Sequence, residues 1–244
     1  MPFVVKNTTF PSLLDLLAPH SCQGCNLIGS PLCDNCKKYI IENHKDHCPK
    51  CKKEKTNLVC PHCQGLPPTF TIDCRNHLLG NLIHDLKYHS VRALARPIAE
   101  IMNTTAPDFS HYSTQDNAFN TAKPQNVYLV PLPTIAKHIR TRGLDHTLLL
   151  AKQFTHLRGS HYHISPLLIR DKNTVQVGSD RNNRLLQASS AYQLNPKINI
   201  NSSATYILFD DVWTTGASLE AAYNLLTSTG IENIIIFALT YSEN

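Results

Sequence analysis

The stretch that decides the fold is Tyr206-Ile-Leu-Phe-Asp210-Asp211-Val-Trp-Thr214-Thr215-Gly216-Ala217-Ser218. Its first four residues are apolar and lead into two adjacent carboxylates, which predicts a buried strand with both acids at its end. A turn rich in hydroxyl groups and glycine follows, and a helix is expected near 218–227. The sequence therefore predicts a strand, a tight turn and a helix, with polar groups gathered at the turn.

The chemistry of this stretch favours a phosphorylated sugar as the ligand. Backbone N–H groups at a helix start, the hydroxyls of Thr214, Thr215 and Ser218, and a glycine that permits close approach form a cradle for phosphate. Asp210 and Asp211 would repel a bare polyphosphate, but they can accept hydrogen bonds from sugar hydroxyls or hold Mg²⁺ through its waters. No Walker-type GKS or GKT sequence follows, which argues against a nucleoside triphosphate.

The sequence around this stretch alternates between short apolar runs and helical spacing. Apolar runs predict strands at 127–130, 166–169 and 234–239, and apolar residues at helical spacing predict a helix across 148–154. Strands that alternate with helices form a parallel sheet covered by helices. The predicted fold class is therefore α/β, a parallel sheet flanked by helices.

The earlier segments divide the chain in two. Residues 69–102 are expected to be mainly helical, because apolar residues recur at helical spacing between Leu78 and Leu86. Residues 103–126 are polar and aperiodic, which predicts a surface loop that is partly ordered or acts as a lid. We assign 68–244 to one domain and 1–67 to a small cysteine-rich module.

All nine cysteines lie between Cys22 and Cys74, and eight of them form four C-x-x-C pairs. The two thiolates of a pair can point at one ion, and two pairs complete the four-thiolate site of structural zinc. Four pairs predict two zinc ions, which hold together a segment too short to bury much core by itself. The expected ligands are Cys22, Cys25, Cys33, Cys36, Cys48, Cys51, Cys60 and Cys63.

The spacing leaves the pairing open. Similar gaps within the first two and the last two pairs favour two consecutive zinc ribbons, and a cross-braced arrangement is the alternative. Redox pairs or free thiols are further alternatives, and His44, His47 or His62 could replace a thiolate. Cys74 is unpaired and is expected to be a small buried apolar residue.

The composition indicates a cytoplasmic protein. No apolar run approaches the roughly 18 residues that a membrane span needs, so no integral membrane segment is expected. The first twenty residues lack the basic start and cleavage site of a signal peptide. In the cytoplasm thiols are kept reduced, where closely spaced cysteines bind metal more often than they form disulfides.

Positive charge gathers in the cysteine-rich module. The net charge is +5, and seven lysines against three acids between Lys37 and Lys55 give a local charge of +4. A basic surface attracts polyanions. A solvated face without a ligand is the alternative.

The stretch from Tyr206 to Ser218 resembles the loop of type I phosphoribosyltransferases that binds 5-phosphoribosyl 1-pyrophosphate (PRPP). The resemblance implies a catalytic pair, Asp210 and Asp211, on the ribose hydroxyls, with Mg²⁺ accompanying PRPP. Ser218 stands where the family usually has threonine, which keeps the hydroxyl. The binding residues implied are Asp210, Asp211, Val212, Thr214, Thr215, Gly216, Ala217 and Ser218. An ordinary strand, turn and helix without a ligand is the alternative.

Further motifs resemble one family, the ComF competence proteins, over nearly the whole chain. Leu86-Lys87-Tyr88 is similar to its LKY signature. Val130-Pro131-Leu132-Pro133 and Arg140-x-Arg142-Gly143 are similar to its VPxP…RxRG segment, the pyrophosphate loop of the wider fold. Gln176-x-Gly178, Arg184 and Ala191-Tyr192 are similar to its Q-x-G…R…A-F stretch, a loop that closes on substrate. PRPP contacts are implied for Lys87, Pro131, Leu132 and Arg142, and Arg140, Arg181 and Arg184 are further cations suited to pyrophosphate.

Two segments depart from the family pattern. The family's RGFNQ is here Arg142-Gly143-Leu144-Asp145-His146, and its Asn before the A-F pair is Gln187. These changes leave the PRPP loop alone. They concern whatever second substrate lies near residues 144–146.

The resemblance implies a role in the uptake or processing of single-stranded DNA during natural transformation, with the DNA-translocation machinery of competence as a protein partner. Lysines can neutralise backbone phosphates, and Tyr39 can stack a base. The lysines expected on DNA are Lys37, Lys38, Lys50, Lys52, Lys53 and Lys55. The alternative is an enzyme that transfers phosphoribose from PRPP to a base or amine that the sequence does not identify, and a third reading is that PRPP is sensed without being consumed.

Overall fold

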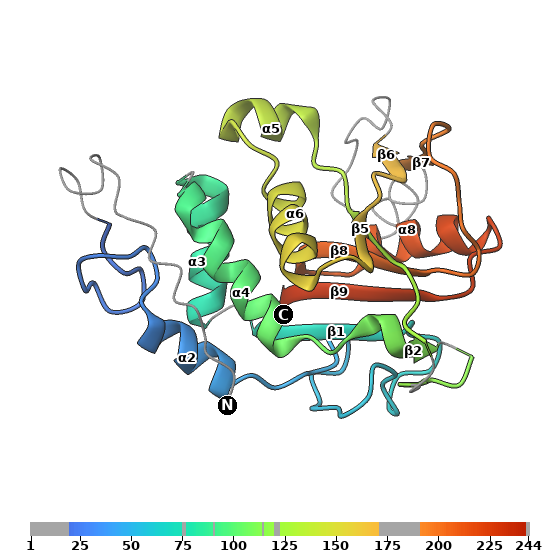
Figure 1. Cartoon of the computed structure of the whole chain (residues 1–244), viewed down its shortest axis with the longest axis horizontal. Coiled ribbons are helices and arrows are strands. Elements are labelled where there is room, and N and C mark those ends of the chain that lie inside the picture. The colour runs from blue at the N-terminus through green and yellow to red at the C-terminus, as the bar shows by residue number, and fades with distance from the viewer. Residues whose placement is uncertain are drawn as a thin grey trace.

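The computed structural model describes residues 20–74, 77–89, 91–113, 115–119, 123–170 and 191–242. A parallel sheet with helices on both faces forms the centre of the protein. The cysteine-rich module, in blue, lies beside it (Figure 1). The five strands of this sheet are β1 (Thr69–Cys74), β4 (Val127–Pro131), β5 (Tyr162–Ile164), β8 (Thr205–Trp213) and β9 (Ile234–Tyr241). The predicted fold class is confirmed.

The strands of the sheet lie in the order β1-β9-β8-β4-β5, and every neighbouring pair is parallel. Their carboxyl ends therefore meet at one edge of the sheet. The register places Pro131 beside Phe209 and Trp213 beside Tyr241. Ligands of open α/β sheets bind at this edge, so the topology gathers the chemistry of distant segments there.

Both faces of the central strands are buried, which explains their nearly continuous apolar sequences. Along β9, Ile235, Phe237 and Leu239 pack into one core, and the residues between them pack into the other. The first core is covered by α3 (Leu78–Tyr88), α4 (Ala95–Thr105) and α6 (His146–Arg158). The second core is covered by α8 (Ala217–Thr227) and the small β6 (Leu168–Arg170) and β7 (Tyr192–Leu194) ribbon.

Helix α3 confirms the helical spacing read from the sequence. Its buried residues Leu79, Leu82, Ile83 and Leu86 follow the i, i+3, i+4, i+7 pattern of one helix face. The expectation that 69–102 is mainly helical was wrong at its start, because Thr69–Cys74 is strand β1, paired with β9. The side chain of Cys74, and the motif residues Gln176, Gly178, Arg181, Arg184 and Gln187, lie outside the described residues.

Several short elements escaped the sequence pattern. Helix α5 (Ala136–Arg142) buries none of its residues, so it has no apolar periodicity to detect. The segment 103–126 begins as the last turn of α4 and then holds the 3₁₀ helix η2 (Phe109–His111) and the hairpin strands β2 (Tyr112–Ser113) and β3 (Ala118–Phe119). A second 3₁₀ helix, η1 (Arg92–Leu94), precedes α4.

The cysteine-rich module packs directly on the sheet domain. Helix α2 (Asp34–Glu42) contacts α4 through Lys37 Nζ and Glu100 Oε2, 2.8 Å apart. Cys22, Ile40 and Leu58 belong to the same apolar cluster as α3 and α4. The module therefore shares the core of the larger domain.

Candidate functional site

The acidic pair lies at the carboxyl end of β8. Asp211 is 3% exposed, and its Oδ2 lies 2.7 Å from both Lys87 Nζ of α3 and His146 Nε2 of α6. The Lys87 ammonium group and the His146 ring nitrogen both face this oxygen. Three segments far apart in the sequence thus meet at one carboxylate.

The two carboxyl groups differ in protonation. Burial alone would raise the pKa of Asp211, but Lys87 and His146 outweigh it and hold that pKa well below its usual range. Burial and the neighbouring charge of Asp211 raise the pKa of Asp210 to about 8. Ionisation of Asp211 is therefore favoured over ionisation of Asp210.

The turn after the acidic pair is shaped by a glycine. Gly216 has φ +79°, and a Cβ added there would lie 2.3 Å from Cζ2 of Trp213. Only glycine fits this backbone, which opens α8 at Ala217. Thr214, Thr215 and Ser218 are exposed around the helix start. The structure thus places three hydroxyl groups and the backbone N–H groups of a helix start next to the acidic pair.

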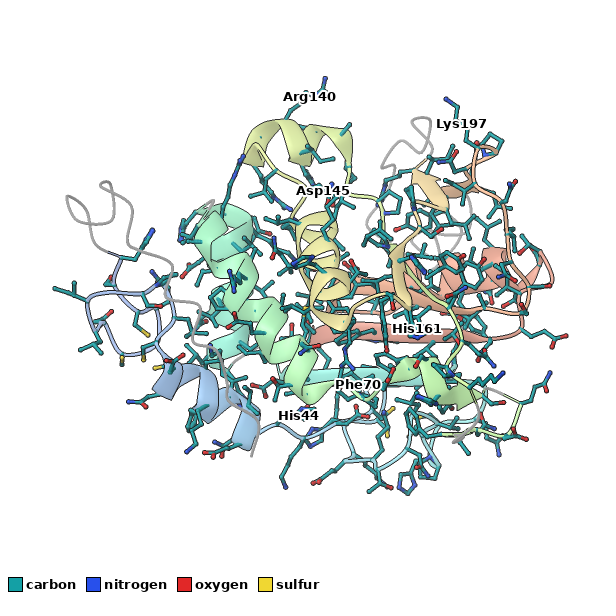
Figure 2. The ribbon with its side chains drawn as sticks, viewed as in Figure 1. His44, Phe70, Arg140, Asp145, His161 and Lys197 are labelled. Carbon is teal, nitrogen blue, oxygen red and sulfur yellow. The ribbon has the colours of Figure 1, made fainter. Side chains whose placement is uncertain are left out.

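The predicted pyrophosphate segment is only partly assembled around the pair. Leu132 follows β4, and its N–H donates to the Phe209 carbonyl at 2.9 Å, next to Asp210. The Arg142 guanidinium of α5 lies 4.8 Å from the ring centroid of Tyr88, which follows Lys87. Arg140 is exposed and points outward from α5 (Figure 2). Of this group, Lys87 is the residue that contacts the acidic pair.

His146 is the site residue whose role the sequence did not reveal. Asp145 caps α6 by accepting from the Leu148 N–H at 3.1 Å, and Thr134 Oγ1 donates to the same Oδ1. This cap fixes the first turn, from which the buried His146 reaches Asp211. The departure from the family pattern at 144–146 was the available signal.

The cysteines form two groups of four, and in each the sulfur atoms lie within 4.8 Å of one another. Cys22, Cys25, Cys33 and Cys36 form the first, and Cys48, Cys51, Cys60 and Cys63 form the second. The consecutive pairing is confirmed, and the cross-braced alternative is wrong. Among the described residues no histidine joins either group, and His44 Nδ1 instead lies 2.7 Å from the Ile72 carbonyl.

The donor sets fit structural zinc. The backbone N–H groups of Cys33 and Gly24 donate to Cys22 Sγ at 3.3 and 3.4 Å. Burial raises the pKa of the Cys22 thiol, but these bonds outweigh it and lower the pKa to about 6. A thiolate is the form that binds metal. Four sulfurs close together, one of them already favoured as a thiolate, could hold a structural zinc ion.

The predicted DNA-contacting lysines separate into distinct environments. Lys55 is 6% exposed and donates to the carbonyl of Thr69 and the carboxylate of Asp46, so it cannot contact DNA, and that assignment is corrected. Its ammonium group ties the module to β1. Lys50 and Lys53 are exposed on the second four-cysteine group.

The other lysines of the predicted set have partners. Lys37 and Lys38 form ion pairs on α2 with Asp34 and Glu42, and Lys37 also pairs with Glu100. Lys52 donates to the carbonyls of Pro49 and Ser242. Exposed ion pairs are weak and exchange readily with other ligands. Lys38, Lys50 and Lys53 therefore remain accessible to a polyanion.

The structure is that of an α/β protein. Its parallel sheet carries an acidic pair and a helix start with exposed hydroxyls at the carboxyl edge, and it is joined to a module with two four-cysteine groups, as in a double zinc ribbon. No family model matches the chain. The competence protein ComFC of Bacillus subtilis (strain 168) is 26% identical over 211 residues, which cover 82% of this chain and 79% of ComFC. This similarity confirms the resemblance to ComF competence proteins that the motifs indicate.

A solved structure with a similar arrangement is the crystal structure of adenine phosphoribosyl transferase from Trypanosoma brucei in complex with AMP, pyrophosphate and ribose-5-phosphate. The match covers 85% of this chain and 79% of the transferase chain, with 12% sequence identity and a TM-score of 0.36. A likeness this weak adds nothing to the assignment, which rests on the ComFC relative and on the chain's own residues. In the described ranges, no helix combines the length and apolar character that a membrane span requires.

Proposed function

We propose that the protein binds PRPP with Mg²⁺ at the acidic pair and the α8 cradle, binds single-stranded DNA on the zinc-ribbon module, and acts in the handling of incoming DNA during natural transformation. The observation that carries the first part is the meeting of Asp210, Asp211 and Lys87 next to an open helix start. This meeting brings acceptors for a sugar, a cation and a candidate anion site together at the carboxyl edge of the sheet.

Each group has a place in this proposal. The 5′-phosphate would lie at the start of α8, on the hydroxyls of Thr214, Thr215 and Ser218. The ribose hydroxyls would bond to Asp210 and Asp211. Lys87, with Pro131, Leu132 and Arg142, would face the pyrophosphate. Bound Mg²⁺ would neutralise part of the pyrophosphate charge, and the acidic pair would hold the ion through its waters.

Calorimetric titration with PRPP and Mg²⁺ tests the first part. Asp211→Asn removes a charged acceptor, so the affinity should fall by about 1.5–3 kcal/mol. Ser218→Ala removes one exposed hydroxyl from the cradle and should weaken binding without touching the buried pair. Asp116→Asn, an exposed carboxylate on the β2–β3 hairpin, is the matched control. Equal PRPP affinity in Asp211→Asn, Ser218→Ala and the parent would rule the site out.

Salt dependence tests the DNA part. If three or four lysines contact phosphates, the slope of log affinity against log salt should be roughly −2 to −3. Replacing Lys50 and Lys53 with Gln should flatten the slope by about 1.4. Lys197→Gln, which changes an exposed lysine in the loop after β7, is the control (Figure 2). A slope equal in the double variant and the control would contradict the proposed surface.

A second candidate function is the transfer of phosphoribose to a base or amine. The ion pair of Lys87 with Asp211 favours it, because a cation at the acidic pair can stabilise departing pyrophosphate. Release of pyrophosphate from PRPP in the presence of one particular acceptor would establish this activity. Binding of PRPP without release, with any acceptor, would support sensing.

A further inference from the structure

Among the described residues, a third group of metal-ligating side chains lies at the C-terminal end of α3, distinct from the two four-cysteine groups. His84, Asp85 and His89 each bring one donor atom within 4.8 Å of the other two. Both histidines are exposed, and Asp85 is partly buried. The group is therefore accessible to an ion from solution.

The three side chains already hold one another in place. His89 Nδ1 lies 2.9 Å from Asp85 Oδ1, and His84 Nδ1 lies 3.7 Å from the same oxygen. The His84 ring packs against the ring of Tyr88, with centroids 4.8 Å apart, which limits its rotation. Within the described part of the chain the polar partners of these three side chains are one another, so an ion that binds them breaks no contact to a fourth residue.

The donor set suits a divalent transition-metal ion. A neutral imidazole offers one nitrogen lone pair and a carboxylate offers two oxygens, so the group can supply two nitrogens and at least one oxygen. Zn–N bonds of about 2.1 Å place tetrahedral ligands roughly 3.4 Å apart, so small rotations of these side chains bring the three donors onto one ion. Imidazole ligands favour Zn²⁺, Ni²⁺ or Cu²⁺ over Mg²⁺ and Ca²⁺, which prefer oxygen.

The end of the helix adds a favourable charge. Helix α3 ends at Tyr88, and His89 is its C-cap. The last carbonyl groups of a helix carry partial negative charge, which stabilises a cation within the last turn. The ammonium group of Lys87, in the same turn, is paired with Asp211 2.7 Å away. The Arg142 guanidinium on Tyr88 opposes part of the gain, so we expect a weaker site than the two four-cysteine groups.

We propose that His84, Asp85 and His89 form a binding site for one divalent transition-metal ion. Three protein ligands leave at least one coordination position open, unlike the closed sites expected at the four-cysteine groups. The ion would therefore exchange with the solution and accept water or an anionic oxygen of another molecule. The site is independent of the proposed binding of PRPP and DNA, and requires neither of them.

The test uses full-length protein that has been loaded with zinc and then freed of loosely bound metal by dialysis. Calorimetric titration with Zn²⁺ should show one further ion per chain. His84→Ala and His89→Ala should each weaken this binding by roughly tenfold or more, because even the loss of a group that orients a ligand costs about 10–100-fold. Both side chains are exposed, so the tightly bound zinc content of the variants should equal that of the parent.

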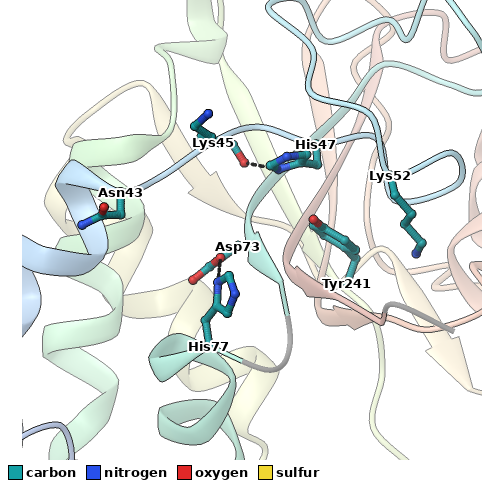
Figure 3. A pocket seen from close by; sticks show the side chains of 7 residues that line it. All are labelled: Asn43, Lys45, His47, Lys52, Asp73, His77 and Tyr241. Carbon is teal, nitrogen blue, oxygen red and sulfur yellow. Dashed lines mark hydrogen bonds and ion pairs between the residues drawn. The ribbon is translucent and has the colours of Figure 1, made fainter.

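His77 provides the matched control at the other end of the same helix. Its side chain is 62% exposed, and its Nδ1 lies 2.6 Å from Asp73 Oδ1 (Figure 3). This histidine–aspartate pair repeats that of His89 and Asp85, but among the described residues it belongs to no group of three metal donors. His77→Ala should therefore bind the further ion as the parent does.

Weaker binding in both His84→Ala and His89→Ala, with His77→Ala unchanged, would establish the site. A parent that takes up no further ion overturns it. A further ion whose affinity changes equally in the site variants and the control lies elsewhere, and an effect of only one site variant shows that the three residues do not act together. Either result overturns the proposal. Excess Mg²⁺ should leave Zn²⁺ binding unchanged, and competition by Mg²⁺ would rule out the imidazole ligands.

Discussion

The zinc-ribbon module and the parallel sheet are stabilised in different ways. In the sheet, Phe237 lies at the centre of an aromatic cluster, with ring centroids 5.3 to 5.9 Å from those of Phe70, Phe109, Phe154 and Phe209. In the module, Leu27 and Ile28 are 62% and 71% exposed, and the short chain turns around two groups of four sulfurs. A large domain can bury its apolar surface, whereas a short segment needs metal.

The two regions are nevertheless joined by buried contacts. Lys55 of the module ties the carboxylate of Asp46 to the backbone of β1, and Asp46 also accepts from the Thr71 N–H at 3.0 Å. Ile40 and Leu58 pack into the core under α3 and α4. Unfolding of the module would therefore also expose part of the core under α3 and α4.

Loss of one zinc site is the largest expected effect. Cys25→Ser should lower the zinc content from two ions to one and unfold the module locally, because a structural zinc site contributes about 10–16 kcal/mol to folding. Metal analysis of freshly reduced protein measures the content, and circular dichroism reports the sheet domain. Cys74→Ser, outside the two groups of four, should retain both ions. A Cys25→Ser protein that still holds two ions would contradict the four-thiolate assignment.

Removal of the central aromatic ring tests the other side of the comparison. Phe237→Ala should lower the free energy of unfolding by about 3–5 kcal/mol, through lost burial and the cavity left behind. Folded protein should keep two zinc ions. Phe119→Ala, which changes an exposed ring on β3, should cost less than about 0.5 kcal/mol. If Phe237→Ala released zinc while the sheet stayed folded, the two regions would not be stabilised separately.

The smallest effect concerns Asp210, the half-buried acid at the sheet edge. Because the pKa of Asp210 is raised to about 8, the folded protein keeps a proton that the unfolded chain loses near pH 4. Stability is therefore lost as the pH rises from about 4 to 8. Asp210→Asn removes this loss and should stabilise the protein by about 1–3 kcal/mol at pH 8.5, and less at pH 5.

Denaturant unfolding at the two pH values measures this difference, with Asp116→Asn as the exposed control. A gain in Asp210→Asn that is the same at both pH values would mean that Asp210 titrates normally. The site would then carry two negative charges at neutral pH.

The sequence by itself determined the parts whose signals are local. The four C-x-x-C pairs identified the eight thiols, because the thiols of one pair lie in one turn, but the fold decided which pairs come together. The sequence also predicted strands β8 and β9 and the turn at Gly216. Buried strands are continuous apolar runs, and a backbone with positive φ favours glycine. Strand β1, at the edge of the sheet, contains two threonines and an aspartate, so its sequence predicted a strand only weakly.

Tertiary structure decided the contacts between distant segments. The sequence could not show that Lys87, His146 and Asp211 meet, because that depends on how α3 and α6 pack on the sheet. Nor could it distinguish Lys55 from its neighbours in a run of lysines, although Lys55 is buried and Lys53 is exposed. The sequence gives the sign of each charged side chain. Its burial and its partners depend on how distant segments of the chain pack together.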